Sequence, residues 1–224
     1  MPTAESFYQA ASGYHATQLE VPEVAFALMA AERARKISPH LRADWRVLEY
    51  GVGTGLNLAA VQCQTRWGFD IASHLGPALS ARDIQFFPAM AQVPGESVDA
   101  VLCHHALEHV PSPVAALAEM ERVLVPQGRL LLYVPYEREA RYRSFRRDEP
   151  NHHLYSWNPQ TLGNLVETAG YVVEEAGCGP TGYERFAAVK AAQWGWPASG
   201  HRAFLAALRL IQPVEEVRVV ARKR

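Results

Sequence analysis

The stretch that decides the fold is VLEYGVGTGLNL, residues 47–58. Its first residues continue a short apolar run that begins at residue 45 and ends at glycine, which is typical of a buried strand. Glycines then occupy positions 51, 53 and 55. Because they carry no side chain, they permit a tight turn and let a ligand approach the backbone. We therefore expect a strand, a ligand-binding turn and then a helix over residues 55–63.

The same alternation of strands and helices continues along the chain. Further strands are predicted at residues 68–71, 84–87, 98–103, 129–134, 171–175 and 214–221, and helices at 21–37, 113–124, 159–169 and 203–211, with a weak helical stretch after the second strand. This pattern predicts an α/β fold with a seven-stranded, mostly parallel sheet and helices on both faces. Such sheets bind ligands beyond the carboxyl ends of their strands, so the residues after strands one, two and four are the site candidates.

Composition limits the classes of protein to consider. The chain has 224 residues and a net charge of −1, which suits one domain and gives no support for nucleic-acid binding. Its three cysteines include no C-x-x-C pair, so we expect neither disulfides nor a zinc knuckle. We see no signal peptide and no apolar run long enough to span a membrane. A cytoplasmic protein that does not bind membranes, either monomer or homodimer, is expected.

The glycine loop resembles a known motif. Its G-x-G-x-G spacing differs from the G-x-G-x-x-G of dinucleotide-binding enzymes and from a P-loop, which disfavours an oxidoreductase. The segment EYGVGTG, residues 49–55, is similar to motif I of the class I methyltransferases that depend on S-adenosylmethionine (SAM). The resemblance implies that Glu49 lies near the methionine amino group, and that Gly51, Gly53 and Gly55 line the cofactor. A glycine-rich turn without a ligand is the alternative.

An acidic residue follows the second predicted strand. Asp70 stands 21 positions after Glu49, and a carboxylate there can accept hydrogen bonds from both hydroxyls of a ribose, as the resemblance also implies. Related enzymes often carry an aspartate for the adenine amino group where this chain has Ala89. The loss of one hydrogen bond would weaken binding roughly 2- to 13-fold, which leaves the backbone N–H of Met90 for the adenine edge. It also leaves open a degenerate cofactor pocket.

The region around the fourth strand strengthens the resemblance. SVDAVLCHHALEHV, residues 97–110, and RVLVPQGRL, residues 122–130, are similar to successive motifs of the same family, with Gln127 in place of a glycine. The resemblance covers about residues 45–135 and implies a Rossmann-like fold. It places Cys103, at the end of the strand, among the residues that bind the cofactor.

Histidines after this strand are candidate general bases. His104 and His105 would face the transferred methyl group, and histidine titrates near neutral pH. His105, Glu108 and His109 have i, i+3, i+4 spacing, and some similar quinone-pathway O-methyltransferases use a divalent cation at such a stretch. A bracing role for Glu108 and His109 is favoured, so no metal ligand is predicted.

The remaining segments are expected to hold the acceptor. The chain is interpreted as one methyltransferase domain, 1–224, with a helical cap at 1–40, a cofactor-binding core at 41–135, and acceptor-side insertions at 136–157 and 183–211, after strands five and six. His153 in the first insertion is a further candidate base. We expect methyl transfer from SAM, with S-adenosylhomocysteine as product, to a small-molecule acceptor, at a hydroxyl. The alternative is a non-catalytic, partner-binding subunit with a degenerate cofactor pocket.

Overall fold

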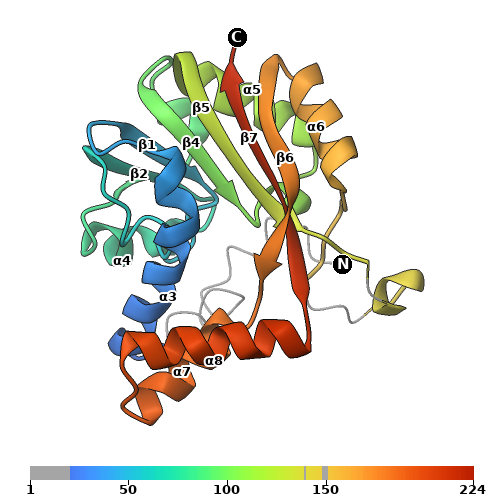
Figure 1. Cartoon of the computed structure of the whole chain (residues 1–224). Coiled ribbons are helices and arrows are strands. Elements are labelled where there is room, and N and C mark those ends of the chain that lie inside the picture. Colours follow the sequence, from blue (N-terminus) through green and yellow to red (C-terminus); the bar gives the residue numbers. More distant parts are fainter. Residues whose placement is uncertain (1–20, 139, 148–150) are drawn as a thin grey trace.

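The computed structural model describes residues 21–138, 140–147 and 151–224, and its centre is one seven-stranded sheet (Figure 1). The strands are β1 Arg46–Tyr50, β2 Thr65–Phe69, β3 Gln85–Phe87, β4 Val98–His104, β5 Leu124–Pro135, β6 Tyr171–Thr181 and β7 Val214–Lys223. Their order is β3-β2-β1-β4-β5-β7-β6. Only the pairings of β7, with β5 and with β6, are antiparallel within the described part of the chain. The predicted mostly parallel seven-stranded sheet is confirmed.

Helices cover both faces of the sheet, and short 3-10 turns lie among the connections. The helices are α3 Glu23–Ile37, α4 Gly76–Ser80, α5 Pro113–Val123, α6 Pro159–Thr168, α7 Glu184–Gln193 and α8 Ala198–Ile211; the 3-10 turns are η1 Ser38–His40, η2 Ser73–Leu75, η3 Met90–Gln92, η4 Leu107–His109 and η5 Ala140–Arg143. Successive residues of β4 enter different cores, because side chains alternate along a strand. Val101 and Cys103 pack with the side chains of α5 and α6, whereas Ala100 and Leu102 pack with those of α3 and α4.

The glycine loop is not followed by the predicted helix. Residues 55–60 form turns and 61–63 are irregular, because β2 already begins at Thr65. A crossover between parallel strands needs a dozen or more residues if it includes a helix, and the glycine loop itself uses part of the available segment. The early start of β2 also corrects the predicted strand at 68–71: Asp70 is the first residue after β2.

The insertion between β6 and β7 contains two helices, where the sequence predicted one over residues 203–211. The missed helix, α7, buries only small or polar side chains such as Ala187, Ala188 and Ala191, and it packs against α3. Alanine gives a weak periodic signal, which explains the omission. In Figure 1, α7 and α8 lie at the end of the molecule towards which the arrow of β4 points.

The described part of the N-terminal cap is one helix, α3, and residues 1–20 of the predicted cap lie outside the described residues. Within those residues, no helix combines the length and the apolar character that crossing a membrane requires.

At the turn inside β5, Gln127 has φ +63° and its side chain accepts a hydrogen bond from Arg222. The motif that this segment resembles has glycine here, the residue for which a left-handed backbone costs least.

Candidate active site

The glycine loop after β1 follows a backbone path that favours glycine. Gly51, Gly53 and Gly55 have φ values of +74°, +50° and +79°. A Cβ at Gly51 would lie 2.5 Å from the Cβ of Ala106, just beyond β4, so this glycine lets two ligand-facing loops approach. A Cβ at Gly55 would lie 2.6 Å from Ile84. The glycine at position 55 is therefore required by core packing.

Asp70 fixes the conformation of the same loop. Its Oδ2 accepts a hydrogen bond from the N–H of Gly53 at 2.9 Å, and its Oδ1 accepts one from the N–H of Ala72 at 2.9 Å. The side chain is buried at the carboxyl edge of the sheet. Since two carboxylate oxygens offer about four lone-pair sites, both oxygens keep capacity for further donors, such as a pair of hydroxyls.

Glu49 is a buried acid with an unsatisfied oxygen. Its Oε1 accepts a hydrogen bond from Asn57 Nδ2 at 2.5 Å, whereas Oε2 has no partner among the described residues. Burial raises the pKa of Glu49 to about 8, although the hydrogen bond from Asn57 and the charge of Arg33 lower it. A cationic group that reached Oε2 would satisfy this carboxylate.

The other two predicted cofactor residues, Cys103 and Met90, could contact a ligand only through their backbone, because their side chains lie in the core. The side chains of Cys103 and Met90 are buried in the core on the α5 face, and burial raises the pKa of the Cys103 thiol. Met90 is the first residue of η3, so its N–H has no partner within that helix and points out of it. Ala89, just before it, has an extended backbone and contributes no side-chain cap.

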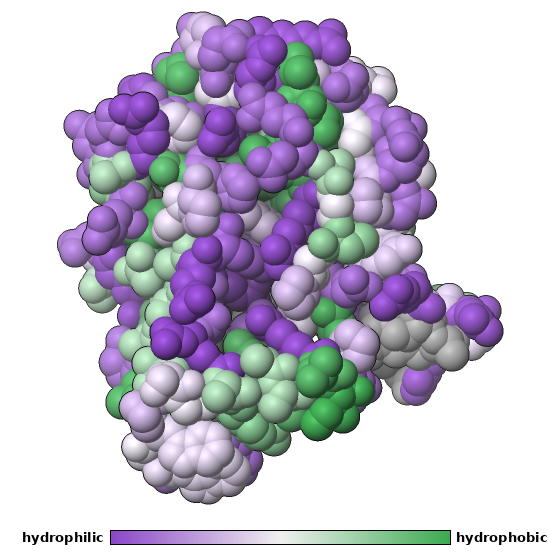
Figure 2. Space-filling view, viewed as in Figure 1, coloured by the Kyte–Doolittle hydropathy of each residue, from purple (hydrophilic) through white to green (hydrophobic). Residues whose placement is uncertain are grey.

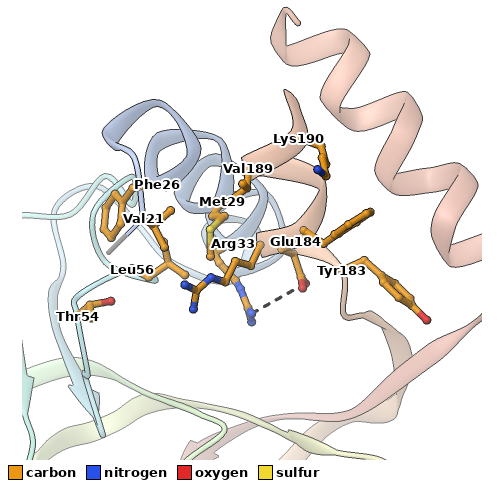
Figure 3. Close-up of a pocket in the computed structure, with 12 residues that line it drawn as sticks. Val21, Phe26, Met29, Arg33, Thr54, Leu56, Tyr183, Glu184, Val189 and Lys190 are labelled. Carbon is orange, nitrogen blue, oxygen red and sulfur yellow. Dashed lines mark ion pairs between the residues drawn. The ribbon is translucent and has the colours of Figure 1, made fainter. Parts of the chain in front are cut away.

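Described residues line two cavities at this edge of the sheet. The larger, about 630 Å³, lies between α3, the glycine loop and α7, and its lining includes Met29, Thr54 and Lys190 (Figure 3). The smaller, about 290 Å³, is lined by residues from the loop after β4 and from both insertions. Arg33 and Glu184 line both cavities, and their ion pair, 3.9 Å, lies at the junction. The space-filling view shows hydrophilic residues around the hollow above α8 (Figure 2).

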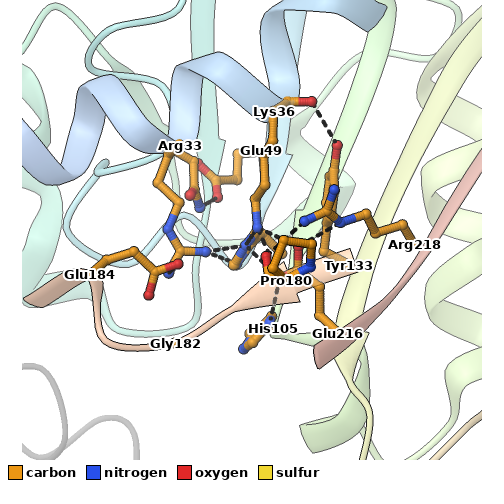
Figure 4. A network of polar contacts seen from close by, with 12 residues as sticks. Arg33, Lys36, Glu49, His105, Tyr133, Pro180, Gly182, Glu184, Glu216 and Arg218 are labelled. Carbon is orange, nitrogen blue, oxygen red and sulfur yellow. Dashed lines mark hydrogen bonds and ion pairs between the residues drawn. The ribbon is translucent and has the colours of Figure 1, made fainter. Parts of the chain in front are cut away.

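One histidine of the smaller cavity is held by a carboxylate that the sequence did not suggest. His105 Nε2 lies 3.2 Å from Oε2 of Glu216, at the start of β7. Glu216 also accepts hydrogen bonds from Lys36 Nζ at 2.6 and 2.8 Å and from Arg218 Nε at 3.0 Å (Figure 4). Burial opposes ionisation of Glu216, but the hydrogen bond from His105 and the charge of Lys36 hold its pKa below the ordinary range.

These contacts also set the charge states of Lys36 and His105. Burial lowers the pKa of Lys36 to about 7, helped by the charge of Arg33. Burial also lowers the pKa of His105, although Glu216 raises it. At neutral pH, His105 is therefore a neutral imidazole whose Nε2–H donates to Glu216, which leaves Nδ1 as a proton acceptor.

His104 is placed differently from its neighbour. Its Nε2 accepts hydrogen bonds from Lys36 Nζ at 2.8 Å and from Arg33 Nη1, and its ring stacks on His105 at 4.4 Å. It is buried and is not among the residues that line the smaller cavity. Burial and the charges of Arg33 and Lys36 hold its pKa well below the usual value. This geometry suits support of the His105 ring.

His153 forms a second histidine–carboxylate pair on the smaller cavity, since its Nδ1 contacts Oε1 of Glu137. The structure does not bring together the set His105, Glu108 and His109 that helical spacing suggested. His105 has φ +52° and precedes η4, so the spacing of a continuous helix does not apply. The structure groups Glu108 and His109 with His153 instead.

The acidic and basic side chains of the first insertion partly pair with each other or with β7. Arg138 forms an ion pair of 2.7 Å with Glu215, which lines the smaller cavity. Among the other arginines of this segment whose side chains the structure describes, Arg143, Arg146 and Arg147 are exposed. This favours the interpretation of a solvated, salt-bridged surface over a dedicated anion site.

Comparison with known proteins agrees with this architecture. A family model described as "Methyltransferase domain" matches residues 23–176. No curated protein matches the sequence significantly.

Solved structures with the same fold include enzymes of differing activity. A SAM-dependent methyltransferase from Thermotoga maritima has TM-score 0.60 and 17% identity, with 89% of this chain and 90% of that chain covered. The methyltransferase chain bound to the activator Trm112 of Haloferax volcanii has TM-score 0.64 and 16% identity, with 99% and 98% covered. The [4+2]-cyclase SpnF has TM-score 0.63 and 21% identity, and the match covers 99% of this chain and 96% of the cyclase.

At these identities the structural similarity shows the fold, whereas the family model covers more than half of the chain. The glycine loop after β1 and the acid after β2 are joined by a hydrogen bond at the carboxyl edge of the sheet. The chain belongs to the methyltransferase-domain family and is a class I SAM-dependent methyltransferase.

Proposed function

We propose that this methyltransferase transfers the methyl group of SAM to a hydroxyl of a small-molecule acceptor bound in the smaller cavity. The observation that carries the proposal is that two histidine–carboxylate pairs, His105 with Glu216 and His153 with Glu137, meet one cavity beside the cofactor edge. A hydroxyl must lose its proton when it is methylated, and a histidine oriented by a carboxylate can accept that proton.

The proposed cofactor contacts follow the carboxyl edge of β1–β4. Glu49 Oε2 would accept from the methionine ammonium, Asp70 from the ribose hydroxyls, and the N–H of Met90 would meet the adenine edge. When bound, SAM supplies a sulfonium methyl group that is open to direct nucleophilic attack. Support for this placement comes from the orphaned oxygen of Glu49 and from the remaining lone pairs of Asp70.

The roles of the histidines follow from their hydrogen bonds. His105 would act through Nδ1, because its Nε2–H is committed to Glu216. His153 would act through Nε2 by the same reasoning, with Nδ1–H donated to Glu137. We assign His104 a positioning role, since Arg33 and Lys36 already occupy its acceptor nitrogen.

The dimensions of the cavity limit the acceptor. A volume of about 290 Å³ is at the low end of small-molecule sites, which favours a compact compound such as a phenol, hydroxy acid or sugar. Tyr136 and Tyr142 line the cavity together with Glu108, so both apolar rings and hydrogen-bonding groups are available to orient it.

The test is a product screen followed by one double substitution. Purified protein is incubated with methyl-labelled SAM and panels of phenols, hydroxy acids, sugars and amines, and labelled products are identified by mass spectrometry. We expect a methyl ether. His105→Gln combined with His153→Gln should lower turnover roughly 100-fold or more, because general-base catalysis contributes about 10²–10⁴.

Two controls separate this proposal from simpler explanations. The double variant should bind SAM as tightly as the wild type in calorimetry, and His152→Gln, at the exposed neighbour of His153, should leave turnover unchanged. A labelled amine as the product, or full turnover by the double variant, would exclude hydroxyl methylation with these bases.

A further inference from the structure

The smaller cavity contains a cluster of donor groups of which the proposed methyl transfer uses only His153. Glu108, His109 and His153 each offer one ligand atom, and these three atoms all lie within 4.8 Å of one another. All three residues line the cavity. We propose that they bind a divalent transition-metal ion, for which Zn²⁺ is the appropriate probe.

The donor set indicates which ions suit the site. Two imidazole nitrogens and one carboxylate are typical ligands of catalytic zinc and of other first-row transition metals. Mg²⁺ and Ca²⁺ prefer oxygen ligands throughout, so the cluster should discriminate against them. Three protein ligands leave positions open, and these would face the cavity.

Glu108 is the strongest indication that a ligand belongs there. Its side chain is 1% exposed, and among the described residues neither carboxylate oxygen has a hydrogen-bond partner. A buried carboxylate without donors is unfavourable unless a proton or a cation neutralises it. His109 Nε2 lies 4.0 Å from Oε1, which is too far for a hydrogen bond.

The backbone holds the three ligands in place. The carbonyl oxygen of Glu108 accepts hydrogen bonds from the N–H of Leu154 at 2.8 Å and of Tyr155 at 3.3 Å. This pairing fixes the segment that carries His153 against η4, which carries the other two ligands. Glu137 contacts His153 Nδ1, in the manner of the carboxylates that orient metal-binding histidines, which leaves Nε2 for the ion. With the ion bound at Nε2, His105 would be the remaining general base of the proposed reaction.

A second cluster shows by contrast why this one suits a cation. His104, His105 and Glu216 also offer ligand atoms within 4.8 Å. There, however, Lys36 and Arg218 already donate to Glu216, and the guanidinium of Arg218 is positively charged. They fill the lone pairs of the carboxylate and repel a metal ion, so we place no metal at that cluster.

The test measures metal binding alone, without cofactor or acceptor, so its result does not depend on the proposed function. Untagged protein is stripped with a chelator and titrated with ZnCl₂ in a calorimeter, and Co²⁺ is added separately to record the visible spectrum of the bound ion. We expect one equivalent of Zn²⁺, much weaker binding of Mg²⁺, and absorption bands that indicate nitrogen ligands.

Substitutions then locate the ion. Glu137→Gln should weaken Zn²⁺ binding roughly 10- to 100-fold, as the loss of an orienting carboxylate does, and Glu108→Gln should weaken it further. Glu215→Gln, at another cavity glutamate that pairs with Arg138, is the matched control and should bind normally. Thermal unfolding of each metal-free variant shows that it is folded.

Two results would overturn the assignment. Unchanged Zn²⁺ affinity in folded Glu108→Gln would mean that the ion binds elsewhere. Loss of binding in His105→Gln together with normal binding in Glu108→Gln would place the ion at the cluster that we have rejected.

Discussion

Glu216 and Glu108 lie beside the same cavity and are buried to the same extent, yet they differ in their surroundings. Lys36, Arg218 and His105 surround Glu216 and hold its pKa below the ordinary range despite burial. Among the described residues no side chain donates a hydrogen bond to Glu108, and burial raises its pKa to about 8, although the charge of His153 lowers it. The chain supplies the counter-charges in the first region. In the second it leaves the carboxylate to be neutralised by a proton or a ligand.

Removal of Glu216 should have the largest effect on stability. Glu216→Gln leaves Lys36 and Arg218 next to a buried neutral group, and loss of one partner of a buried ion pair costs about 3–5 kcal/mol. The free energy of unfolding from urea titrations at neutral pH measures this. Glu108→Gln, under the same conditions with a chelator, should lose nothing. Equal losses in both variants would remove the distinction between the two regions.

The second test uses pH. The pKa of Glu108 is about 8 in the folded protein and near 4.5 in the unfolded chain, so the folded state binds more protons between these values. Its contribution to stability is therefore present below the unfolded pKa and is lost as pH rises through about 8.

Consequently, Glu108→Gln should become more stable than the wild type as pH rises from 5 to 9, by an amount on the order of a few kcal/mol. Urea unfolding of both proteins at several pH values, with a chelator present, gives the difference. A difference that does not change with pH would show that Glu108 finds a counter-charge in the chain. Zn²⁺ should abolish the pH dependence if the proposed site is correct.

Glu49 extends the comparison to a third buried acid, with one hydrogen-bond donor and one oxygen without a partner among the described residues. Glu49→Gln should weaken SAM binding roughly 10- to 100-fold, the size of a charged hydrogen bond, without loss of stability. Calorimetric titration measures it, with Glu96→Gln at an exposed position as control. Unchanged affinity for SAM would show that the methionine ammonium does not bind Glu49.

The smallest test concerns strain instead of charge. Gln127 has φ +63°, and its hydrogen bond from Arg222 only partly offsets that cost. Gln127→Gly should raise the free energy of unfolding by about 0.5–1 kcal/mol, because glycine adopts this conformation without a steric penalty. Thermal and urea unfolding measure the gain, and Gln127→Ala should not show it. A lower free energy of unfolding in the glycine variant would show that the hydrogen bond from Arg222 contributes more to stability than the backbone strain costs.

Sequence analysis predicted the sheet and most helices because their patterns are local. The strand before Gly51 and the helix closed by Gly170 each carry their own signal. The carboxylates that contact the candidate histidines, Glu216 and Glu137, have no such local sequence signal. Glu216 lies 111 positions from His105 in the sequence, and the two meet because β7 pairs antiparallel with β5. No sequence motif predicts this contact. The helical spacing of residues 105–109 was misleading because His105 has a left-handed backbone.

The pairing of Glu108 with the segment around His153 has a consequence for divergence within such a fold. The N–H groups of Leu154 and Tyr155 bind a carbonyl oxygen, and these bonds do not depend on which side chains the three residues carry. A substitution at position 153 can therefore exchange one functional group for another while the backbone that presents it stays in register. A single substitution at this position would therefore change the functional group that lines the cavity, while the loop keeps its backbone hydrogen bonds.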